Sequence, residues 1–405
     1  MDVDPHLTTG PRPDNASAAF GATATRPAVV LQVLPTLVTG GAERGCIDVA
    51  IGLAEAGAVP LVASQGGPMV RELDRAGIKH ITLPLASKNP LTIRRNAKRL
   101  EQVIREHGVD IVHARSRAPA WSAWMACGRT GAHFMTTFHA PYNFKGGLKR
   151  WYNSVMARGE RVIAISEFVR DHVLANYDVD PARVRLIHRC YDPSVFAPER
   201  VNSARIIQLA KQWRLPDDRP VILLPGRLTR WKGQIVLIEA LEKLVRTLGH
   251  KDLCCLLVGS DQGRSGYRQE LEERAKRAGL EGVVRLTGDC SDMAAAYTLA
   301  TVVVSASREP EAFGRVIVEA QAMGKPVIVT SIGAYRETVI PGETAWVVPP
   351  DDSDALAKAL GEALALSDAE RAAIGAHAQA FVSQRFTKER MVAETLAVYG
   401  ELLGA

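Results

Sequence analysis

Short runs rich in Val, Ile and Leu alternate with segments of helical period along almost the whole chain, and this alternation limits the fold more than any other feature. Strand, helix and strand in succession form the repeating unit of parallel sheets. Strands are expected in the first half at residues 29–34, 59–64, 80–85, 110–114, 134–138, 161–165 and 184–188. A second series is expected at residues 221–224, 253–258, 283–286, 301–305, 327–330 and 346–348. The sequence therefore predicts an α/β protein with two doubly wound, Rossmann-like sheets.

Two domains are also expected from the length of 405 residues, because a single core stops growing at about 250–300 residues. Prolines and paired acids mark residues 191–220 as the boundary region, and a helical tail is predicted to break near Thr387. Residues 1–26 are rich in Gly, Pro, Ser, Thr and Ala and predict a disordered leader. The predicted parts are a leader (1–26), a first domain (27–195), a second domain (196–385) and a terminal helix (386–405).

The sequence favours a cytoplasmic location. No apolar run reaches the roughly 18 residues that cross a bilayer. Residues 1–26 also lack the basic start and apolar stretch of a secretory signal. The six cysteines have irregular spacings without a C-x-x-C pair, which is typical of buried, reduced thiols.

The net charge of +6 lies entirely in the first half of the chain. Residues 1–199 contain 24 Lys and Arg against 18 Asp and Glu, whereas residues 200–405 contain 26 of each kind. This asymmetry predicts an anionic partner for the first half and leaves open nucleic acid, an acidic lipid surface or a phosphorylated substrate.

Two loops in the first half carry unusual chemistry after their strands. Gly40 and Gly41 follow the first strand and precede a helix expected to begin near Glu43. Paired glycines allow close backbone approach, and a helix N-terminus suits a phosphate, although a tight structural turn has the same pattern. His139 ends the fifth strand in a loop stiffened by Pro141, where it could donate to a sugar hydroxyl or a phosphate.

The second series of strands opens with two basic residues between glycines. Arg227 and Lys232 leave the strand at residues 221–224 and enter a helix start. Two fixed cations there could neutralise a diphosphate and stabilise it as a leaving group. A solvated basic turn is the alternative explanation.

The strongest pattern follows the strand at residues 301–305. Glu311 is expected in the loop and Glu319 one to two turns into the next, largely apolar helix. Carboxylates accept hydrogen bonds and therefore suit hydroxyl-rich ligands such as a ribose and a hexose.

These motifs, taken in order, resemble those of the retaining GT-B glycosyltransferases of family 4. The resemblance rests on Gly40-Gly41-Ala42-Glu43, the Arg227 and Lys232 pair, and the Glu311 and Glu319 pair, and it covers roughly residues 28–405. It implies that two Rossmann-like domains face each other across a cleft and that the C-terminal helix returns to the first domain. It also implies that the second domain binds a sugar nucleotide and the first holds the acceptor.

The resemblance assigns roles to individual residues. His139, Glu311, Arg227 and Lys232 would be catalytic. Gly40 and Gly41 would face the diphosphate or the acceptor, and His139 would face the donor sugar. Arg227 and Lys232 would hold the diphosphate, Glu311 the sugar hydroxyls and Glu319 the ribose. The backbone at Gly288 and Asp289 would meet the base, and Ala312, Phe313 and Gly314 complete the donor-binding set.

The reaction implied is transfer of a hexose-type sugar from a nucleoside-diphosphate sugar to a glycan or lipid-linked acceptor, with retention and without metal or cofactor. Lipopolysaccharide or exopolysaccharide synthesis in bacteria is the setting that the resemblance suggests. The acidic segment at residues 351–354 is explained more simply as a helix cap than as a metal site. A sugar-nucleotide epimerase or phosphorylase on the same fold, and a non-catalytic sugar-nucleotide-binding module, remain alternatives.

Other classes fit the sequence less well. Neither half contains G-x-G-x-x-G after its first strand, and the chain has no G-x-x-x-x-G-K-[ST], which argues against a dinucleotide oxidoreductase and a P-loop NTPase. An aromatic content of 6% provides no base-stacking series, so no nucleic-acid partner is expected.

Residues 144–161 combine a local charge of +4 with an apolar stripe. The positions 148, 151, 152, 155 and 156 recur at helical spacing, which predicts one amphipathic helix. The stripe could pack on the sheet, or the end carrying Phe144, Lys145, Lys149 and Arg150 could rest on anionic lipid. The second possibility predicts peripheral contact, from Phe144 to Arg161, with the inner face of the membrane.

Overall fold

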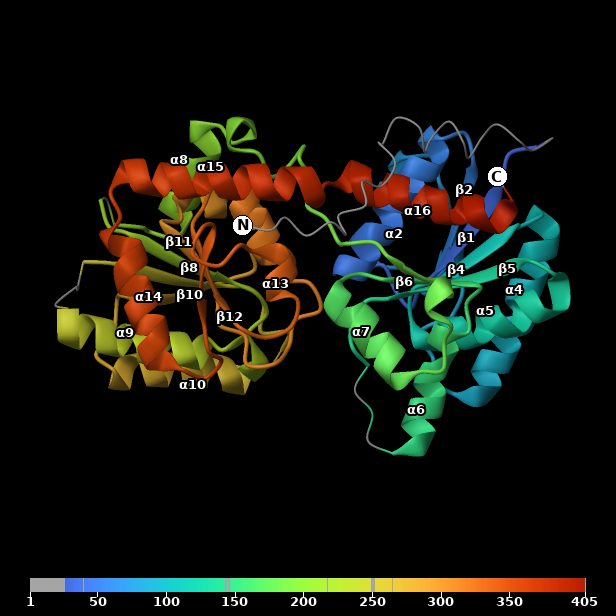
Figure 1. The fold of residues 1–405 in the computed structure, drawn as a ribbon, viewed down its shortest axis with the longest axis horizontal. Coiled ribbons are helices and arrows are strands. Elements are labelled where there is room, and N and C mark those ends of the chain that lie inside the picture. The colour runs from blue at the N-terminus through green and yellow to red at the C-terminus, as the bar shows by residue number, and fades with distance from the viewer. Residues whose placement is uncertain are drawn as a thin grey trace, which may run out of the picture. The chain divides into compact units, whose positions relative to one another are not determined.

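The computed structural model in Figure 1 describes residues 26–38, 40–142, 144, 146–216, 218–248, 252–263 and 265–404. Apart from Arg26, the predicted leader therefore lies outside the described residues. The described chain forms two compact units. The first runs to Arg189 and takes in the residues from Lys388 onward, and the second is Cys190–Thr387.

The first unit is built on a parallel sheet with strand order β3-β2-β1-β4-β5-β6-β7 within the described residues. Its strands are β1 (Val29–Val33), β2 (Val59–Ser64), β3 (Lys79–Thr82), β4 (Ile111–Ala114), β5 (His133–Phe138), β6 (Arg161–Ala164) and β7 (Val184–Leu186). Its helices are α2 (Gly41–Glu55), α3 (Val70–Arg75), α4 (Pro90–His107), α5 (Arg117–Thr130), α6 (Gly147–Asn153), α7 (Glu167–Asn176) and α16 (Lys388–Leu403), with short 3₁₀ turns η1 (Ser154–Ala157) and η2 (Pro181–Arg183). The terminal helix α16 packs against α2.

The second unit has a parallel sheet with strand order β10-β9-β8-β11-β12-β13 in the part of the chain that is described. Its strands are β8 (Val221–Pro225), β9 (Cys254–Val258), β10 (Val284–Gly288), β11 (Val302–Ser305), β12 (Val327–Thr330) and β13 (Ala345–Val348). Its helices are α8 (Ser203–Gln212), α9 (Gln234–Leu248), α10 (Ser265–Arg277), α11 (Met293–Leu299), α12 (Arg315–Ala322), α13 (Tyr335–Thr338), α14 (Ser353–Ala365) and α15 (Asp368–Arg385), with 3₁₀ turns η3 (Pro198–Arg200) and η4 (Arg230–Lys232).

Burial explains why these runs form parallel strands. Every residue of β1, β8 and β9 is buried, as expected for strands covered by helices on both faces. Two clusters of buried apolar side chains, which include Leu224 and Leu223 of β8 respectively, belong to the second unit. The α/β fold with two doubly wound parallel sheets is therefore confirmed.

Several predicted boundaries need correction. The third strand ends at Thr82 instead of residue 85, and Pro84, which lacks an N–H, cannot continue the ladder. The first helix begins at Gly41, before Glu43. The tail also has a break that was not predicted, between α14 and α15, where Ser367 and Glu370 form a reciprocal capping box. Asp352 caps α14 through the amides of Asp354 and Ala355, as predicted.

Among the helices that the structure describes, none combines the length and hydropathy needed to span a bilayer.

Candidate functional site

The strand order of the second sheet changes direction between β8 and β11. In open parallel sheets, ligands bind beyond the carboxyl ends of the strands at such a switch point. The loop after β8 carries Arg227 and Lys232, and the loop after β11 carries Glu311. Pairing of β8 with β11 therefore brings together charged residues that are 79 positions apart in the sequence.

The Glu311 carboxylate receives three hydrogen bonds on one oxygen. Lys232 Nζ donates to Oε1 at 2.7 Å, and Ser305 Oγ donates to it at 3.2 Å. The Ser307 hydroxyl is the third donor. No hydrogen bond to Oε2 occurs within the described residues, and the side chain keeps 17% of its surface exposed. Glu311 thus has one fixed oxygen and one that can accept from a ligand.

Electrostatics keep Glu311 ionised. Burial is the largest influence and would raise the pKa of this carboxyl, but the Lys232 ammonium and the hydroxyls of Ser307 and Ser305 together lower the pKa below its usual value. An acceptor-only carboxylate is the form that binds sugar hydroxyls.

Gly233 positions Lys232 against the Glu311 loop. It has φ +71°, and a Cβ there would collide with the carbonyl oxygen of Ala306, so only glycine permits this approach. The Lys232 ammonium also lies 4.5 Å from the centroid of the Trp231 ring. Arg227 is exposed and reaches Gln262 Oε1 only at 3.5 Å, which leaves its guanidinium available.

Glu319 lies on α12, five residues in, and is 7% exposed. Its Oε1 accepts from Arg315 Nη2 at 2.9 Å and its Oε2 from the Tyr297 hydroxyl at 3.1 Å. Burial raises the pKa of Glu319, while Arg315 and Tyr297 oppose that rise. Phe313 is buried as well and packs edge-on against Phe386, with ring centroids 5.3 Å apart. The Glu319 and Phe313 side chains are thus buried, whereas the Arg227 side chain is exposed.

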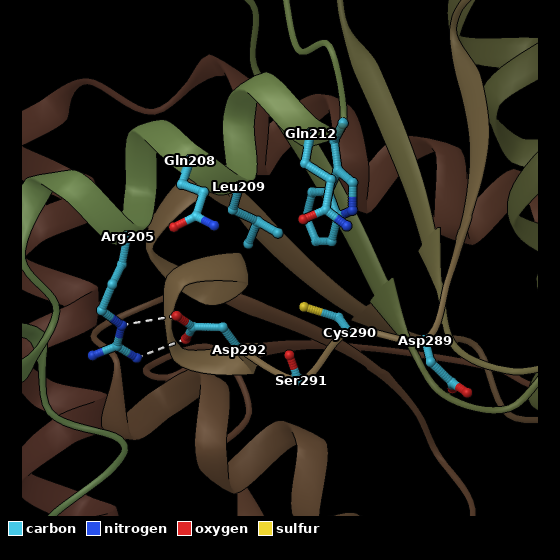
Figure 2. Close-up of a pocket in the computed structure, with 9 residues that line it drawn as sticks. Arg205, Gln208, Leu209, Gln212, Asp289, Cys290, Ser291 and Asp292 are labelled. Carbon is cyan, nitrogen blue, oxygen red and sulfur yellow. Dashed lines mark hydrogen bonds and ion pairs between the residues drawn. The ribbon is translucent and has the colours of Figure 1, made fainter.

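Gly288 ends β10 with φ +78°, and Asp289 follows it. Figure 2 shows a polar pocket with Asp289 at one end and the Arg205–Asp292 ion pair, 2.6 Å long, at the other. Gln208 and Gln212 of α8 line it together with Cys290 and Ser291. None of Arg227, Lys232, Glu311 and Glu319 is among its lining residues. Asp289 therefore lines a pocket that is separate from the four predicted charged residues.

In the first unit, α2 begins at Gly41, beyond the carboxyl end of β1, and Gly40 is its N-cap residue. Gly40 has φ +141°, and a Cβ there would lie 2.5 Å from Oε2 of Glu43, so the acid folds back over the helix start. Burial raises the pKa of Glu43, while its own backbone N–H and Arg189 act in the opposite direction. A carboxylate thus already lies at the predicted anion position.

His139 follows β5, and its Nε2 is buried without a hydrogen-bond partner in the described part of the chain. Burial, followed by the charges of Arg189 and Arg115, holds the pKa of His139 well below its usual value. The ring is therefore neutral at pH 7, which agrees with a role as a hydrogen-bonding group.

The segment predicted to form one amphipathic helix does not do so. The helix α6 ends at Asn153, where the Ser154 hydroxyl donates to the Trp151 carbonyl and a 3₁₀ turn follows. Val155 and Met156 are fully buried, whereas Leu148 and Trp151 are 82% and 54% exposed. The stripe is thus split into a packed half and an exposed half. Lys145 lies outside the described residues.

Comparison with known proteins identifies the family. The family model described as Glycosyl transferases group 1 matches residues 206–381, and that described as Glycosyltransferase Family 4 matches residues 39–195. A solved glycosyltransferase structure from Rickettsia africae ESF-5 shares 39% sequence identity, with a TM-score of 0.86 over 93% of this chain and 99% of that chain. The chain belongs to the group 1 glycosyltransferases of the GT-B fold.

Two further proteins are similar to this chain. D-inositol 3-phosphate glycosyltransferase of Xylanimonas cellulosilytica is 28% identical over 307 residues, which is 72% of each chain. The structure of Anabaena HepE in complex with UDP-glucose is 25% identical, with a TM-score of 0.78 over 91% of this chain and 99% of that chain.

The glycosyltransferase structure brings Lys232 and Glu311 into direct contact, whereas Arg227 remains apart from both and Glu319 is paired elsewhere. Sequence reasoning missed Ser305 and Ser307, which fix the carboxylate. The signal was present as two hydroxyls at the end of a strand, in the Ser-Ala-Ser run before Glu311. Sequence reasoning also missed the placement of Arg115 and Arg189 beside His139.

Proposed function

We propose that this glycosyltransferase moves a hexose-type sugar from a nucleoside-diphosphate sugar to a glycan or lipid-linked acceptor, with retention of anomeric configuration. The Lys232–Glu311 contact at the switch point of the second sheet carries the proposal. A carboxylate with one free oxygen can bind sugar hydroxyls, and the adjacent cations can bind the diphosphate. The complex of Anabaena HepE with UDP-glucose supports a sugar nucleotide as donor.

The bond between the anomeric carbon and the β-phosphate oxygen breaks, and its electron pair stays with the departing diphosphate. Arg227 and Lys232 stabilise the growing negative charge on that leaving group. The acceptor oxygen then bonds to the anomeric carbon on the same face, through a short-lived oxocarbenium-like state. The acceptor's proton passes to the departing phosphate oxygen, so no protein base is required.

Remaining donor contacts follow the predicted roles. Glu319 holds the ribose, the backbone at Gly288 and Asp289 meets the base, and the Ala312–Gly314 backbone completes the donor pocket at the start of α12. His139 donates to the donor sugar, and Gly40 and Gly41 face the diphosphate or the acceptor. The two cations supply the positive charge that a metal would otherwise provide.

An exposed apolar and basic surface in the first unit supports a lipid-linked acceptor. This α6 surface consists of Leu148, Trp151 and Trp124, which are 82%, 54% and 36% exposed, together with Lys149, Arg150 and Arg158. Aromatic and basic side chains are typical of surfaces that rest on anionic bilayers. We propose that it contacts the inner face of the membrane in lipopolysaccharide or exopolysaccharide synthesis.

A panel of UDP-, GDP- and ADP-sugars, scored by thermal shift and then by product analysis, tests the proposal. A bound donor at about 100 times its Kd stabilises the fold by roughly 2.7 kcal/mol. Donors with one of the three bases should raise the Tm clearly. The same donor should yield a glycoside that keeps the anomeric configuration of the donor. Stabilisation without transfer to any acceptor would favour a binding module, and an isomerised sugar nucleotide would favour an epimerase.

A further inference from the structure

A groove of about 560 Å³ lies in the first unit, away from the residues assigned to the donor and the acceptor. It is lined by the end of α5, the turn into β5 and the residues before β6, at the edge of the sheet where these two strands begin (Figure 1). Gly40 and His139 follow the carboxyl ends of β1 and β5, at the opposite edge. Ligand sites typically enclose about 300–1,000 Å³. The groove is therefore large enough for a ligand, but the proposed reaction gives it no role.

Gly128 keeps the floor of the groove open. It lies inside α5 without a positive φ, and a Cβ there would meet no atom within 4 Å. Neither the backbone nor the packing therefore requires glycine at this position. Glycine also destabilises a helix relative to alanine, because its unfolded backbone has more freedom to lose. Its effect here is to leave a stretch of bare backbone that a ligand can approach.

The walls of the groove are apolar. Trp124 is 36% exposed, and Phe134 and Cys127 lie beneath it at 4% and 5%. Burial raises the pKa of the Cys127 thiol to about 12, so this wall is uncharged at pH 7. The Trp124 ring stands edge-on to Trp121, with centroids 5.8 Å apart, and Trp121 packs on Trp151 at 4.6 Å. A row of three indole rings thus joins the groove to the exposed Trp151.

Arg158 adds a positive charge beside these apolar walls. It is exposed, its guanidinium carbon lies 4.5 Å from the centroid of the Trp124 ring, and it forms no ion pair within the described residues. The acid that lines the groove, Glu160, is already engaged. Its Oε2 lies 2.8 Å from His133 Nδ1, and its Oε1 accepts from the Phe134 amide at 3.1 Å. A guanidinium held on a ring face keeps its N–H donors for an anion.

We propose that this groove binds one anionic phospholipid, with the phosphate on Arg158 and an acyl chain along Trp124 and the Gly128 backbone. Arg129, which is 49% exposed and also lines the groove, supplies a second cation for the headgroup. The α6 surface would rest on a bilayer, whereas the groove would hold a single lipid molecule.

Charge and continuity select a lipid as the occupant. A phospholipid carries an anionic phosphate beside apolar chains, which matches a guanidinium beside apolar walls. A soluble phosphate would leave the Trp124 indole uncovered, and a neutral glycan would leave Arg158 without a counter-charge. Trp124 and Arg158 also belong to the α6 surface, so the groove continues from the surface proposed to contact the membrane. This membrane setting rests on the proposed function, whereas the groove and its charge do not.

Dihexanoyl phosphatidylglycerol is the probe, used below its critical micelle concentration so that single molecules bind. Calorimetry on the full chain should show saturable binding of one molecule per chain. Dihexanoyl phosphatidylcholine has the same chains without net charge, and glycerol 3-phosphate has the anion without the chains. Each should bind about tenfold more weakly or worse, because each lacks one of the two matching features.

Gly128→Leu tests the groove without loosening the fold. The leucine side chain enters open space and fills the groove, and leucine favours a helix more than glycine does, so the Tm should stay the same or rise. Affinity for phosphatidylglycerol should fall by about tenfold or more. Gly266→Leu is the matched control, because Gly266 lies in α10 of the second unit and also has no atom within 4 Å of a Cβ. It should bind as wild type does.

Arg158→Gln tests the anion. Affinity for phosphatidylglycerol should fall to that for phosphatidylcholine, and affinity for phosphatidylcholine should not change. Arg71→Gln, at an exposed arginine on α3 of the same unit, should behave as wild type.

Several results would overturn the proposal: no phosphatidylglycerol binding by wild type, equal affinity in wild type and Gly128→Leu, or equal affinity for the two lipids. Self-association of wild type without lipid, abolished by Gly128→Leu, would assign the groove to a second copy of the chain instead. If wild type binds the single lipid but no vesicles, the groove is supported and only the membrane contact of the α6 surface is contradicted. UDP affinity tests the proposed function separately and should be equal in every variant, because none of these residues is assigned to the donor site.

Discussion

Lys232 Nζ and Glu311 Oε1 lie 2.7 Å apart, and this contact joins the loops that follow β8 and β11. Ser305 and Ser307 donate to the same oxygen, so the carboxylate is held in one orientation before any ligand arrives. A preorganised acceptor of this kind needs no rearrangement during the reaction. In the proposed function, its second oxygen is the atom that accepts from a hydroxyl of the donor sugar.

Glu311→Gln should reduce transfer severely while leaving nucleoside-diphosphate affinity nearly unchanged. The amide has only one acceptor oxygen, so the variant cannot both satisfy Lys232 and accept from a sugar hydroxyl. Turnover and UDP affinity, by initial rates and calorimetry, provide the check. Glu309→Gln, at an exposed neighbour, is the control and should behave as wild type. Turnover within a few-fold of wild type in Glu311→Gln would remove this residue from the mechanism.

Glu319→Ala should weaken nucleoside-diphosphate binding by about 1–3 kcal/mol and should also destabilise the fold. The stability loss is expected because the variant removes the buried carboxylate that accepts from Arg315 and from the Tyr297 hydroxyl. It should be on the order of 2–3 kcal/mol, since Arg315 keeps 30% of its side chain exposed. Tyr297→Phe removes only one hydrogen bond to the same carboxylate and serves as the comparison. Unchanged affinity in a folded Glu319→Ala protein would place the ribose elsewhere.

Much of the fold was predictable because strand-helix alternation is a local signal. The ends of the elements were harder to predict. Pro84 stops the hydrogen-bond ladder of the third strand before the apolar run ends. The Ser367–Glu370 capping box interrupts the C-terminal tail, although the composition of the tail stays helical. Both signals were present in the sequence, but a continuing apolar or helical pattern masked them.

The part of the site that the sequence could predict is the gathering of residues that follow strands. Because Glu311 and Lys232 follow strands, a parallel sheet had to gather them at one edge. Their direct contact, and the roles of Ser305 and Ser307, depend on loop paths that a single sequence does not encode locally. His139 shows the same limit, because its burial and the nearby charges of Arg189 and Arg115 arise only in the folded chain.

Transfer should persist in excess EDTA, because Arg227 and Lys232 provide the positive charge for the leaving diphosphate. Initial rates with and without chelator, at constant ionic strength, are sufficient to show this. Loss of activity in EDTA that Mn²⁺ or Mg²⁺ restores would contradict the metal-free mechanism.

Acidification below about pH 6.5 should destabilise the protein through His139. The pKa of His139 is held well below its usual value in the folded state, so the unfolded state binds the proton first. The free energy of unfolding therefore falls as the pH falls from about 6.5 toward the folded pKa, by at most about 1.4 kcal/mol per pH unit for this group. His113 acts in the same direction, whereas the raised pKa values of Glu43 and Glu319 act in the opposite one.

His139→Gln removes the titration of His139 and leaves the other titrating groups in place. Urea unfolding at pH 7, 6 and 5 should therefore show a shallower decline in the variant than in wild type. Parallel declines would mean that His139 titrates normally in the folded protein.

The α6 surface should bind vesicles that contain anionic lipid. Leu148 and Trp151 can insert their apolar groups, and each basic residue near the membrane contributes about 1 kcal/mol. The Trp151 ring also packs on the Trp121 ring, with ring centroids 4.6 Å apart, and this contact holds Trp151 in its exposed position. Leu148→Ser with Trp151→Ser should therefore reduce co-sedimentation strongly, and Lys149→Glu with Arg150→Glu should do so mainly at low salt, since screening weakens charge attraction. Leu91→Ser is the control, because Leu91 is 62% exposed on α4, outside the α6 surface, and the variant should sediment as wild type. If wild type fails to bind at low salt, or all variants bind equally, the acceptor is better sought among soluble glycans.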